Sequence, residues 1–450
     1  MVHPASRPLA VSLLLAGLLA PAAARANAFA LDLQGLFSNG TASAGAAAAR
    51  DPAGQFANPA VLASLEGTRL VLGGMLIAPN APYTDAGSTL LDGGMALPGK
   101  NGDGGQTGGA PWLFASHRLS PELAVGLALT APFGTSSDYG KASGFYGRYQ
   151  GVESRIESWA FGPSVAWRPT GKLALGLAVA ARRDRAVIGQ AFDLGSICVA
   201  QAAGGGDPDP VATCAGLGLV PGESDGYGKF EADGWSWTAT VGLTFEPAPG
   251  TQLGLGYRRE AKGKVKGDEA LDLATAGLLG VLPTASASME LPLPDFATLS
   301  LSQRLGEALT LHAAVQLSLW KRLDTLELVP DDAGAGLALE AKQGYRNTVR
   351  AAVGAAFAVS PGVELFAGAA FEQSPITDEV RQVPLPERDS LLVGAGGEVS
   401  LGRLTFGAVY QRVQMLGDSK IDQAGATGDR VVGAVKGSAN LAVVQLGWRG

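Results

Sequence analysis

The sequence predicts an all-β fold: a 14-stranded antiparallel transmembrane β-barrel with an N-terminal helical hatch that plugs its lumen. Three observations predict it. Apolar residues alternate with polar or small ones over long stretches, such stretches occur fourteen times, and the connections between them are alternately short and long. Strict alternation indicates strands with one apolar face. Short turns at one end and long loops at the other are typical of outer-membrane barrels, whose short turns are periplasmic.

The alternation is clearest between Leu309 and Trp320, where every odd-numbered residue is apolar and the even-numbered ones are mostly polar or small. The stretches from Gly234 to Phe245 and from Lys172 to Arg182 repeat the pattern. These strands are longer than the roughly 5–6 residues that are usual in soluble sheets. The predicted strands are residues 67–79, 110–118, 122–132, 155–168, 172–187, 229–246, 251–263, 295–305, 308–320, 345–359, 362–372, 389–399, 403–413 and 439–449.

Every second connection is long. The long connections are residues 80–109, 133–154, 188–228, 264–294, 321–344, 373–388 and 414–438. Because a bilayer offers backbone groups no hydrogen-bond partners, strands can cross it only in a closed sheet. Trp159 and Trp167 share one face of a strand and lie roughly 20 Å apart along the membrane normal once strand tilt is allowed for. They suit one aromatic girdle each, although either tryptophan alone would also suit a core.

The composition excludes several other classes. Of the 450 residues, 46% are hydrophobic and only 17% are charged, so the chain is too apolar to be disordered. Past residue 26, no apolar run reaches the about 18 residues that a transmembrane helix needs. The formal net charge is −7, which argues against nucleic acid as a partner because phosphate binding needs clustered Lys and Arg.

Residues 1–26 have the features of a secretory signal peptide. An apolar core from Leu9 to Ala20 is followed by Ala24-Arg25-Ala26, with small residues at the positions that signal peptidase reads. Export places Cys198 and Cys214 in an oxidising compartment, which favours a disulfide between them. The alternative, a pair of metal ligands, lacks the nearby His or further Cys of a zinc site. We expect no metal and no cofactor.

Residues 27–66 precede the first strand and are predicted to form the hatch, and residues 67–450 form the barrel. The stretches from Ala28 to Phe37 and from Ala42 to Arg50 are predicted to be short helices. Fourteen strands leave a lumen too wide for wall side chains to fill, so a segment rich in Phe and Leu at its mouth is a natural plug. A flexible periplasmic tail is the alternative, but such a tail would be more polar.

Several short motifs occur in the order known from one family. They are Asn58-Pro59-Ala60, Thr130-Ala131-Pro132-Phe133-Gly134, Gly147-Arg148-Tyr149, Gly256-Tyr257-Arg258-Arg259-Glu260, Leu293-Pro294-Asp295, Trp320, Gly344-Tyr345-Arg346-Asn347-Thr348, Phe371-Glu372-Gln373-Ser374-Pro375 and Pro384-Leu385-Pro386-Glu387-Arg388-Asp389. Through them nearly the whole mature chain resembles the FadL-type outer-membrane long-chain fatty acid and hydrocarbon transporters. The sequence departs from the family at its end, Trp448-Arg449-Gly450, where such barrels usually finish on an aromatic residue.

The resemblance implies a monomeric, passive transporter in the bacterial outer membrane, surrounded by outer-membrane lipid. The substrate would land on extracellular loops, enter a lumenal pocket above the hatch motif Asn58-Pro59-Ala60, and leave sideways through the wall. The family's third strand is kinked to make the lateral opening. Here that strand is 122–132, which contains Gly126 and ends at Pro132; both residue types can break a ladder. Loop leucines, among them Leu278, Leu279 and Leu282, would capture the substrate or pack on one another.

A fatty acid carboxylate in an apolar pocket needs a cation. Strand phase directs Arg346 and Arg350 into the lumen, and the resemblance also favours Arg346, which is our first choice. On the fifth strand, phase favours Arg182 and the resemblance favours Arg185, so both are kept. Arg258 faces the lumen by phase. The alternative for each arginine is a salt bridge within the barrel.

Other functions remain open at this point. An aromatic hydrocarbon channel of the same fold needs no cation. A barrel phospholipase could assemble a Ser and a His from separate strands, with His312 facing inward. An open porin is disfavoured by the plug and by the few charges on the strands. Gly417-Asp418-Ser419 looks like a hydrolase motif, but it lies in a predicted loop and lacks the strand-to-helix elbow. We therefore expect a transporter and not an enzyme.

Overall fold

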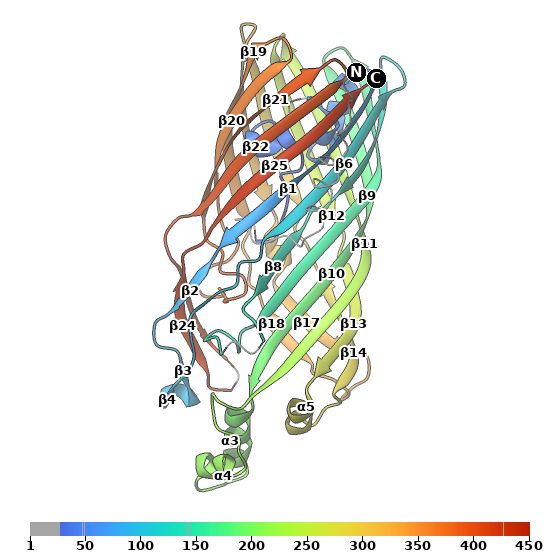
Figure 1. The fold of residues 1–450 in the computed structure, drawn as a ribbon. Coiled ribbons are helices and arrows are strands. Elements are labelled where there is room, and N and C mark those ends of the chain that lie inside the picture. Colours follow the sequence, from blue (N-terminus) through green and yellow to red (C-terminus); the bar gives the residue numbers. More distant parts are fainter. Residues whose placement is uncertain (1–27, 47, 49, 142–143, 426) are drawn as a thin grey trace, which may run out of the picture.

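The computed structural model describes residues 28–450 except 47, 49, 142, 143 and 426. The predicted signal peptide, residues 1–26, lies outside the described residues. A 19-stranded antiparallel sheet dominates the described chain, and fourteen of its strands close into a barrel because β1 pairs with both β25 and β6 (Figure 1). The predicted 14-stranded barrel is confirmed.

Each barrel strand overlaps one predicted strand. The fourteen are β1 (Thr68–Asn80), β6 (Gly108–Arg118), β7 (Leu123–Thr130), β9 (Glu153–Thr170), β10 (Leu173–Asp193), β11 (Asp225–Ala248), β12 (Thr251–Glu260), β15 (Phe296–Leu305), β16 (Leu309–Ser318), β19 (Thr348–Ser360), β20 (Val363–Glu372), β21 (Ser390–Leu401), β22 (Leu404–Met415) and β25 (Ser438–Arg449). The short turns gather at one end, together with the C-terminus, and the long connections gather at the other (Figure 1). We take the end with the long connections as extracellular.

The long connections are more ordered than predicted. Five strands extend the barrel sheet at the extracellular end: β8 (Gly134–Asp138), β13 (Gly263–Leu271), β14 (Thr284–Leu291), β17 (Thr325–Pro330) and β18 (Leu339–Lys342). A second, six-stranded sheet contains β2 (Pro82–Asp85), β3 (Thr89–Leu90), β4 (Met95–Ala96), β5 (Gly102–Asp103), β23 (Ser419–Ala424) and β24 (Arg430–Val435). Short helices complete the loops: α3 (Leu194–Gly204), α4 (Pro210–Gly216), α5 (Leu273–Leu279), η4 (Leu91–Gly93) and η5 (Trp320–Arg322).

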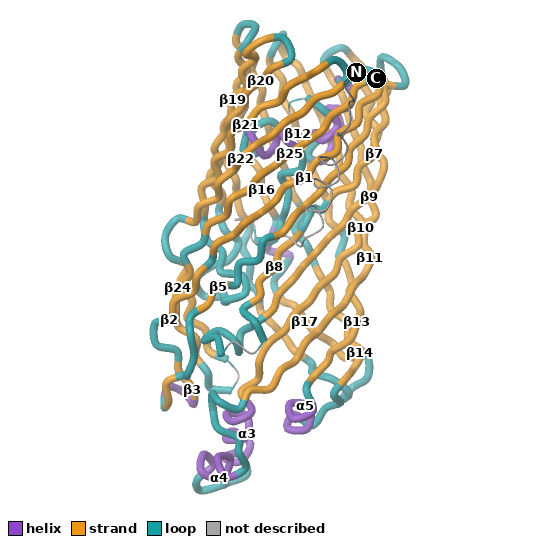
Figure 2. The backbone as a smooth tube through the Cα atoms, viewed as in Figure 1, coloured by secondary structure: helices purple, strands orange, loops and turns teal. Residues whose placement is uncertain are grey.

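The prediction of plain loops at 188–228 and 264–294 was therefore wrong. The β10–β11 ladder continues to the pair Asp193↔Asp225, and β13 and β14 form a further hairpin beside β11 (Figure 2). Paired backbone satisfies its hydrogen bonds without loop turns. Among the described residues, no helix is long and apolar enough to cross a membrane.

The outer face of the barrel carries an apolar band. Leu177, Val179 and Val241 are exposed on it, as alternation predicted. Trp159 and Trp235 flank Arg183 on the neighbouring strands, so aromatic rings lie where outward charges begin at the extracellular boundary. Trp167 is also exposed and lies near the short turn that joins β9 to β10. The two predicted girdle tryptophans thus lie at opposite edges of the band.

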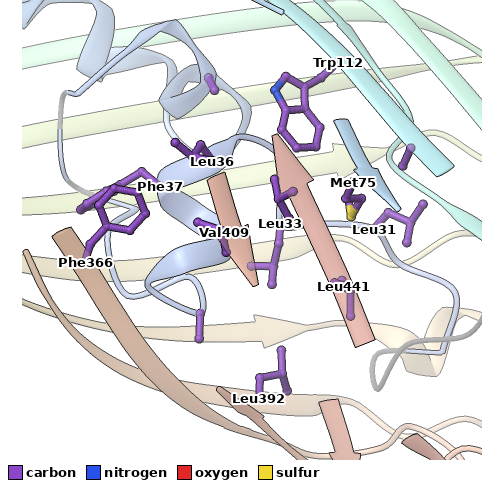
Figure 3. Packing of buried hydrophobic residues seen from close by; sticks show 14 of the residues in the cluster. Leu31, Leu33, Leu36, Phe37, Met75, Trp112, Phe366, Leu392, Val409 and Leu441 are labelled. Atoms are coloured by element: carbon purple, nitrogen blue, oxygen red, sulfur yellow. The ribbon is translucent and has the colours of Figure 1, made fainter. Parts of the chain in front are cut away.

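The segment before β1, residues 28–66, lies inside the barrel and is called the lumenal segment below. It contains α2 (Leu36–Gly40), η2 (Pro52–Phe56) and η3 (Pro59–Ser64). Leu33, Leu36 and Phe37 pack against inward side chains of the wall, including Trp112 and Phe366 (Figure 3). Burial of these apolar side chains holds the segment in place.

The predicted helices at 28–37 and 42–50 were wrong. Ala30 forms an antiparallel bridge with Phe133, so this part of the lumenal segment is extended. Gly35 follows with a φ of 95°, which an α-helix cannot contain. The first helix, α2, begins only at Leu36. Residues 41–46 form turns, and the other two helical pieces begin at Pro52 and Pro59. Proline is favoured in the first helical turn.

Glycines in the wall make room for the lumenal segment. A Cβ atom on Gly242 would overlap the Asn58 side chain, and one on Gly176 would overlap the backbone of Ala60. Asn58 Nδ2 also donates to the carbonyl of Leu243, 2.9 Å away, while its Oδ1 accepts from Ala60 N and caps η3. The abundance of glycine in this sequence is therefore partly explained by how closely the wall approaches the segment.

We expect Gly242→Val to displace the lumenal segment, because the valine side chain would occupy the space of Asn58; overpacking of this kind costs about 1–3 kcal/mol. The check is the ion conductance of single channels in a planar bilayer, which should rise as the lumen opens. Gly171→Val, in a short turn with open space around it, is the matched control and should conduct like the wild type. Unchanged conductance in folded Gly242→Val would contradict this account of the packing.

Candidate functional site

A cavity of about 500 Å³ opens in the extracellular half of the lumen. Strands β9, β10, β11, β13, β14, β17 and β18 contribute to it, with the connection at 373–388 and the first residues of the lumenal segment. Its apolar lining includes Phe29, Ile156, Ile188, Phe192, Phe230, Leu271, Met289, Leu291, Leu323, Leu326, Leu328, Tyr345, Ile376 and Leu385. A cavity of this size and polarity suits a drug-sized apolar ligand.

A few charged groups interrupt this lining. Lys229 and Glu153 lie 3.5 Å apart as an ion pair. Lys342, at the end of β18, forms no ion pair among the described residues and is exposed at the cavity margin. Glu269 accepts a hydrogen bond from Leu337 N at 2.8 Å, and burial raises the pKa of its carboxyl group above the usual value. Lys342 is thus the cation of the cavity with the fewest competing partners.

An aromatic cluster lies at the floor of the cavity, where its members Phe29 and Tyr345 line the cavity itself. Phe29 packs edge-on against Trp320 with ring centroids 5.0 Å apart, and Trp320 contacts Tyr345 at 5.9 Å. Phe133 lies below, 6.2 Å from both Phe29 and Phe296. These rings come from the lumenal segment, the β7–β8 junction and the ends of three barrel strands, so they join parts of the chain that are distant in sequence.

The wall is interrupted beside this floor. Strand β7 ends at Thr130 and β8 starts at Gly134, while β9 pairs with both. The pairing of β6 with β7 extends only to Leu113↔Leu129, and in the described part of the chain β8 pairs along its length with β9 alone. The residues around Pro132 are therefore the place where the barrel ladder is broken.

The lumenal segment bonds the free backbone groups of this break. Leu31 N donates to the carbonyl of Pro132 and Gly134 N donates to that of Phe29, both at 2.8 Å. Gln34 adds a side-chain bond to the carbonyl of Ala131 at 3.1 Å. An unsatisfied backbone group at membrane depth would cost several kcal/mol, so the segment closes the break energetically as well as sterically.

The two predicted lateral-opening residues are separated. Pro132 lies in the break itself. Gly126 lies inside β7, where a Cβ atom would collide with Ser164, Gln55 and Leu62. The structure thus places Gly126 against the lumenal segment and not at the break.

Three predicted arginines point into the lumen but do not line the large cavity. Arg350 forms a bidentate pair with Asp32, with both N–O distances 2.9 Å, and it also pairs with Glu372. Asp32 belongs to the lumenal segment, so this pair ties the segment to β19. The inward direction that phase predicted is correct, and the salt bridge raised as an alternative is present.

Arg182 and Arg258 share a second buried ion-pair network. Arg182 pairs with Asp184 at 2.9 Å and with Glu260, and Arg258 lies 3.0 Å from Glu260. Arg258 also stacks between Phe56 and Phe296, 4.3 and 4.5 Å from their ring centroids. Buried charges of this kind persist only when paired.

The lumenal placement of Arg346 and Arg185 was wrong. Strand β19 begins only at Thr348; Tyr345 lines the cavity, and Arg346 is half exposed and pairs with Asp389 at 3.3 Å. Arg185 follows the outward phase of β10 and pairs with Glu231 beyond the apolar band. The side-chain period of two could have excluded Arg185 from the sequence alone.

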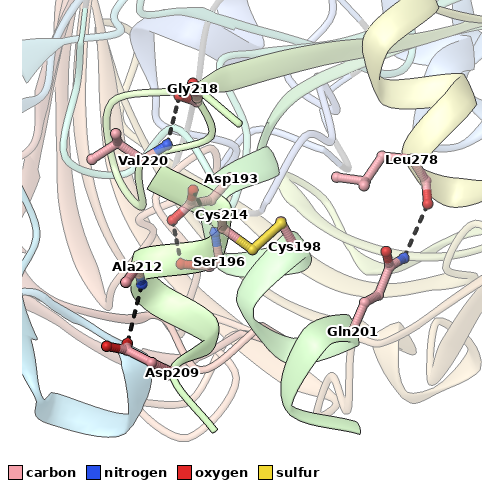
Figure 4. Close-up of a disulfide and its surroundings, with 11 residues drawn as sticks. Asp193, Ser196, Cys198, Gln201, Asp209, Ala212, Cys214, Gly218, Val220 and Leu278 are labelled. Carbon is pink, nitrogen blue, oxygen red and sulfur yellow. Dashed lines mark hydrogen bonds between the residues drawn. A yellow bond between two sulfur atoms is a disulfide. The ribbon is translucent and has the colours of Figure 1, made fainter. Parts of the chain in front are cut away.

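The loop residues lie at the extracellular tip. Leu278 and Leu279 end α5, Leu282 follows, and none of the three lines the large cavity. A disulfide joins Cys198 on α3 to Cys214 on α4, and Gln201 Nε2 donates to the carbonyl of Leu278 at 3.0 Å (Figure 4). The disulfide-linked helices therefore brace α5. No group of three or more described His, Cys, Asp or Glu residues could hold a metal ion.

Sequence reasoning missed the acids that neutralise the lumenal arginines. Asp184 and Glu260 each follow an inward arginine by two residues, and Glu372 lies opposite Arg350 in the register of β19 and β20. The period of two carried that signal. Lys342 could not have been found this way, because β18 has only four residues.

Comparison with known proteins agrees with the geometry. The profile of a family described as outer membrane protein transport protein (OMPP1/FadL/TodX) matches residues 17–449. A putative outer membrane protein of Neisseria meningitidis is 24% identical over 93% of this chain and 92% of its own length. A long-chain fatty acid transport protein of Escherichia coli is 23% identical over 79% of this chain and 80% of its own.

Solved structures share the fold. A FadL homologue of Pseudomonas aeruginosa superposes with a TM-score of 0.80 at 21% identity, covering 94% of this chain and 99% of that one. The toluene transporter TbuX of Ralstonia pickettii superposes with a TM-score of 0.65 at 22% identity, covering 93% and 99%.

We expect Glu260→Gln to lower stability by about 3–5 kcal/mol, because it leaves the buried Arg258 and part of the charge of Arg182 uncompensated. The check is the temperature at which the folded band is lost in gel electrophoresis of unheated and heated samples. The matched control is Glu290→Gln, which removes an exposed partner 3.7 Å from Lys262 and should change stability by less than about 1 kcal/mol. Equal shifts in the two variants would contradict the prediction.

Proposed function

Since the chain belongs to the OMPP1/FadL/TodX family of outer-membrane proteins that transport hydrophobic compounds, we propose that its substrates are long-chain fatty acids. The family is one of transport channels and not of enzymes. The observation that carries the proposal is the apolar cavity of about 500 Å³ with Lys342 at its margin. An alkyl chain gains burial in such a lining, and a carboxylate gains a cation.

Capture begins at the loops in this proposal. Leu273 and Leu282 are 78% and 57% exposed near the extracellular tip, and Leu217 is 71% exposed on the disulfide-linked loop. Apolar side chains exposed together at a mouth mark a surface for a hydrophobic ligand. The substrate then moves into the cavity, where Lys342 meets the carboxylate.

Exit is proposed through the break around Pro132. The cavity ends at Phe29, and residues 29–31 occupy the break through backbone hydrogen bonds and the ring contacts of Phe29. Withdrawal of those residues would open a path from the cavity to the lipid. No nucleotide motif is present in the sequence, so movement is proposed to follow the concentration gradient.

The second candidate substrate is an aromatic hydrocarbon. It is favoured by the predominantly apolar lining and by the fold shared with a toluene transporter. Such a ligand has no charge for Lys342 to meet, so the two candidates differ in their dependence on this residue.

We expect Lys342→Ala to weaken binding of radiolabelled oleate to the detergent-folded protein by about tenfold, since a hydrogen bond to a charged group contributes about 1.5–3 kcal/mol. Lys342→Arg should retain binding, and Arg346→Ala, which removes a cation outside the cavity, should bind like the wild type. The contrary outcome is that Lys342→Ala binds oleate as well as the wild type does and that toluene competes equally in all variants. The proposed substrate would then be the aromatic hydrocarbon and not the fatty acid.

We also expect a disulfide between Ala30→Cys and Phe133→Cys to block transport but not binding. The two residues form a non-hydrogen-bonded antiparallel pair, and Cα atoms about 4.5 Å apart permit a disulfide. The measurement is oleate uptake by cells before and after mild reduction. Wild type treated with the same reductant controls for loss of the native Cys198–Cys214 bond, and Phe133→Cys alone controls for loss of the ring. Uptake that is undiminished in the oxidised double variant would exclude this exit.

A further inference from the structure

Two exposed cations lie just beyond the extracellular ends of neighbouring strands: Lys321 follows β16 and Arg346 precedes β19. Lys321 N donates to Asn347 Oδ1 at 3.0 Å, which brings the neighbourhoods of Lys321 and Arg346 into contact. Both side chains are exposed, and Lys321 forms no ion pair among the described residues. Neither side chain lines the large cavity in the lumen.

Directly along the wall from these cations runs an apolar groove. It has a volume of about 640 Å³ and crosses β15, β16, β19, β20 and β21 on their outward face. Small side chains, Ala313, Ala351 and Ala369, form its base, while Leu301, Phe371 and Leu391 rise beside it. The register places Ala351 between Val315 and Phe371, so the depression is continuous across three strands.

The groove extends from Leu253, near a short turn, to Ala351, near the extracellular end of β19. Ala351 is five residues from Arg346, which is roughly 16 Å along an extended strand. One leaflet of the hydrocarbon core is roughly 15 Å thick. An acyl chain of the outer leaflet that lay in the groove would therefore bring its headgroup to Arg346 and Lys321.

The cations are available to a stronger anion. Arg346 Nε donates to the carbonyl of Ser374 at 3.0 Å, and its guanidinium pairs with Asp389 at 3.3 Å. The side chains of that pair are 50% and 37% exposed, and an exposed pair contributes at most about 1 kcal/mol. A phosphate monoester carries about −1.5 to −2 charges near neutral pH. Arginine can grip such a group with two parallel hydrogen bonds, and lysine adds a second charge.

We propose that this face binds a phosphorylated glycolipid of the outer leaflet, with one acyl chain in the groove and a phosphate monoester between Arg346 and Lys321. The surface is continuous with the membrane-facing band, so a lipid is the occupant that the position supplies. The proposal concerns the outside of the wall and is independent of which substrate passes through the lumen.

The test is a titration of the folded protein in detergent with lipid A, followed by native mass spectrometry. The double variant Lys321→Ala, Arg346→Ala should bind at least about tenfold more weakly, since two charge-assisted contacts are lost. Arg430→Ala is the matched control, because Arg430 is an equally exposed arginine paired with Asp422 in a loop sheet. Its lipid A binding should equal that of the wild type.

A second pair of variants tests the groove. Ala351→Phe fills it and should weaken lipid A binding, whereas Ala367→Phe, on the same outward face but outside the groove, should not. Phosphatidylglycerol, a phosphodiester, should bind more weakly than lipid A, and inorganic phosphate should compete only at far higher concentration. The proposal would be overturned if the double variant Lys321→Ala, Arg346→Ala bound lipid A as tightly as the wild type does. It would also be overturned if the wild type bound phosphatidylglycerol as tightly as lipid A. Oleate binding, measured in parallel, should be wild-type throughout and separates this result from the test of the cavity.

Discussion

The structure depends on one constraint: inside a bilayer, every backbone N–H and C=O group must find a partner within the protein. Closing β1 onto β25 meets the constraint around the whole circumference. The only long departure described in the wall is the stretch between Thr130 and Gly134, and there Phe29 and Leu31 supply the bonds that a neighbouring strand would have made. The lumenal segment and the wall are thus parts of a single hydrogen-bonded system, and any path through this break would have to exchange those bonds for others.

Besides the apolar packing of Leu33, Leu36 and Phe37, two kinds of contact hold the lumenal segment at a defined height. Close approach is possible only because the wall has glycine where the backbone passes, as at Gly242 beside Asn58. The second kind of contact is an ion pair: Asp32 of the lumenal segment accepts two hydrogen bonds from Arg350 of β19, which orients the segment relative to that strand. Removing either kind alone would leave the other in place. These contacts fix the lumenal segment against the wall, while its first residues, around Phe29, border the cavity.

The barrel could be predicted from the sequence because a period of two, repeated over ten residues or more, has one structural meaning in a chain of this length. The same period gave the inward direction of Arg182, Arg258 and Arg350. The period failed for Arg346 because β19 begins only at Thr348, two residues after Arg346. Where a strand begins depends on tertiary contacts, which the local pattern does not contain. The lumenal segment was predicted to be helical between residues 28 and 37 because local propensity favours helix. In the structure, residues 29–31 are extended because they bond backbone groups around Phe133 that have no strand partner, and this tertiary contact outweighs helix propensity. Whether a lumenal arginine is free or paired depends on contacts across the barrel, which local pattern does not report.

The pairing of β1 with β25 has a consequence for biogenesis. The first and last strands of the chain form one seam, so the cylinder exists only after residue 438 and those that follow have been delivered. The lumenal segment precedes β1 in the chain. The wall fits so tightly around Asn58 and Ala60 that this segment could not be threaded into a closed barrel. It must be enclosed while the sheet is still an open ribbon. Enclosure of the lumenal segment therefore has to precede closure of the seam between β1 and β25.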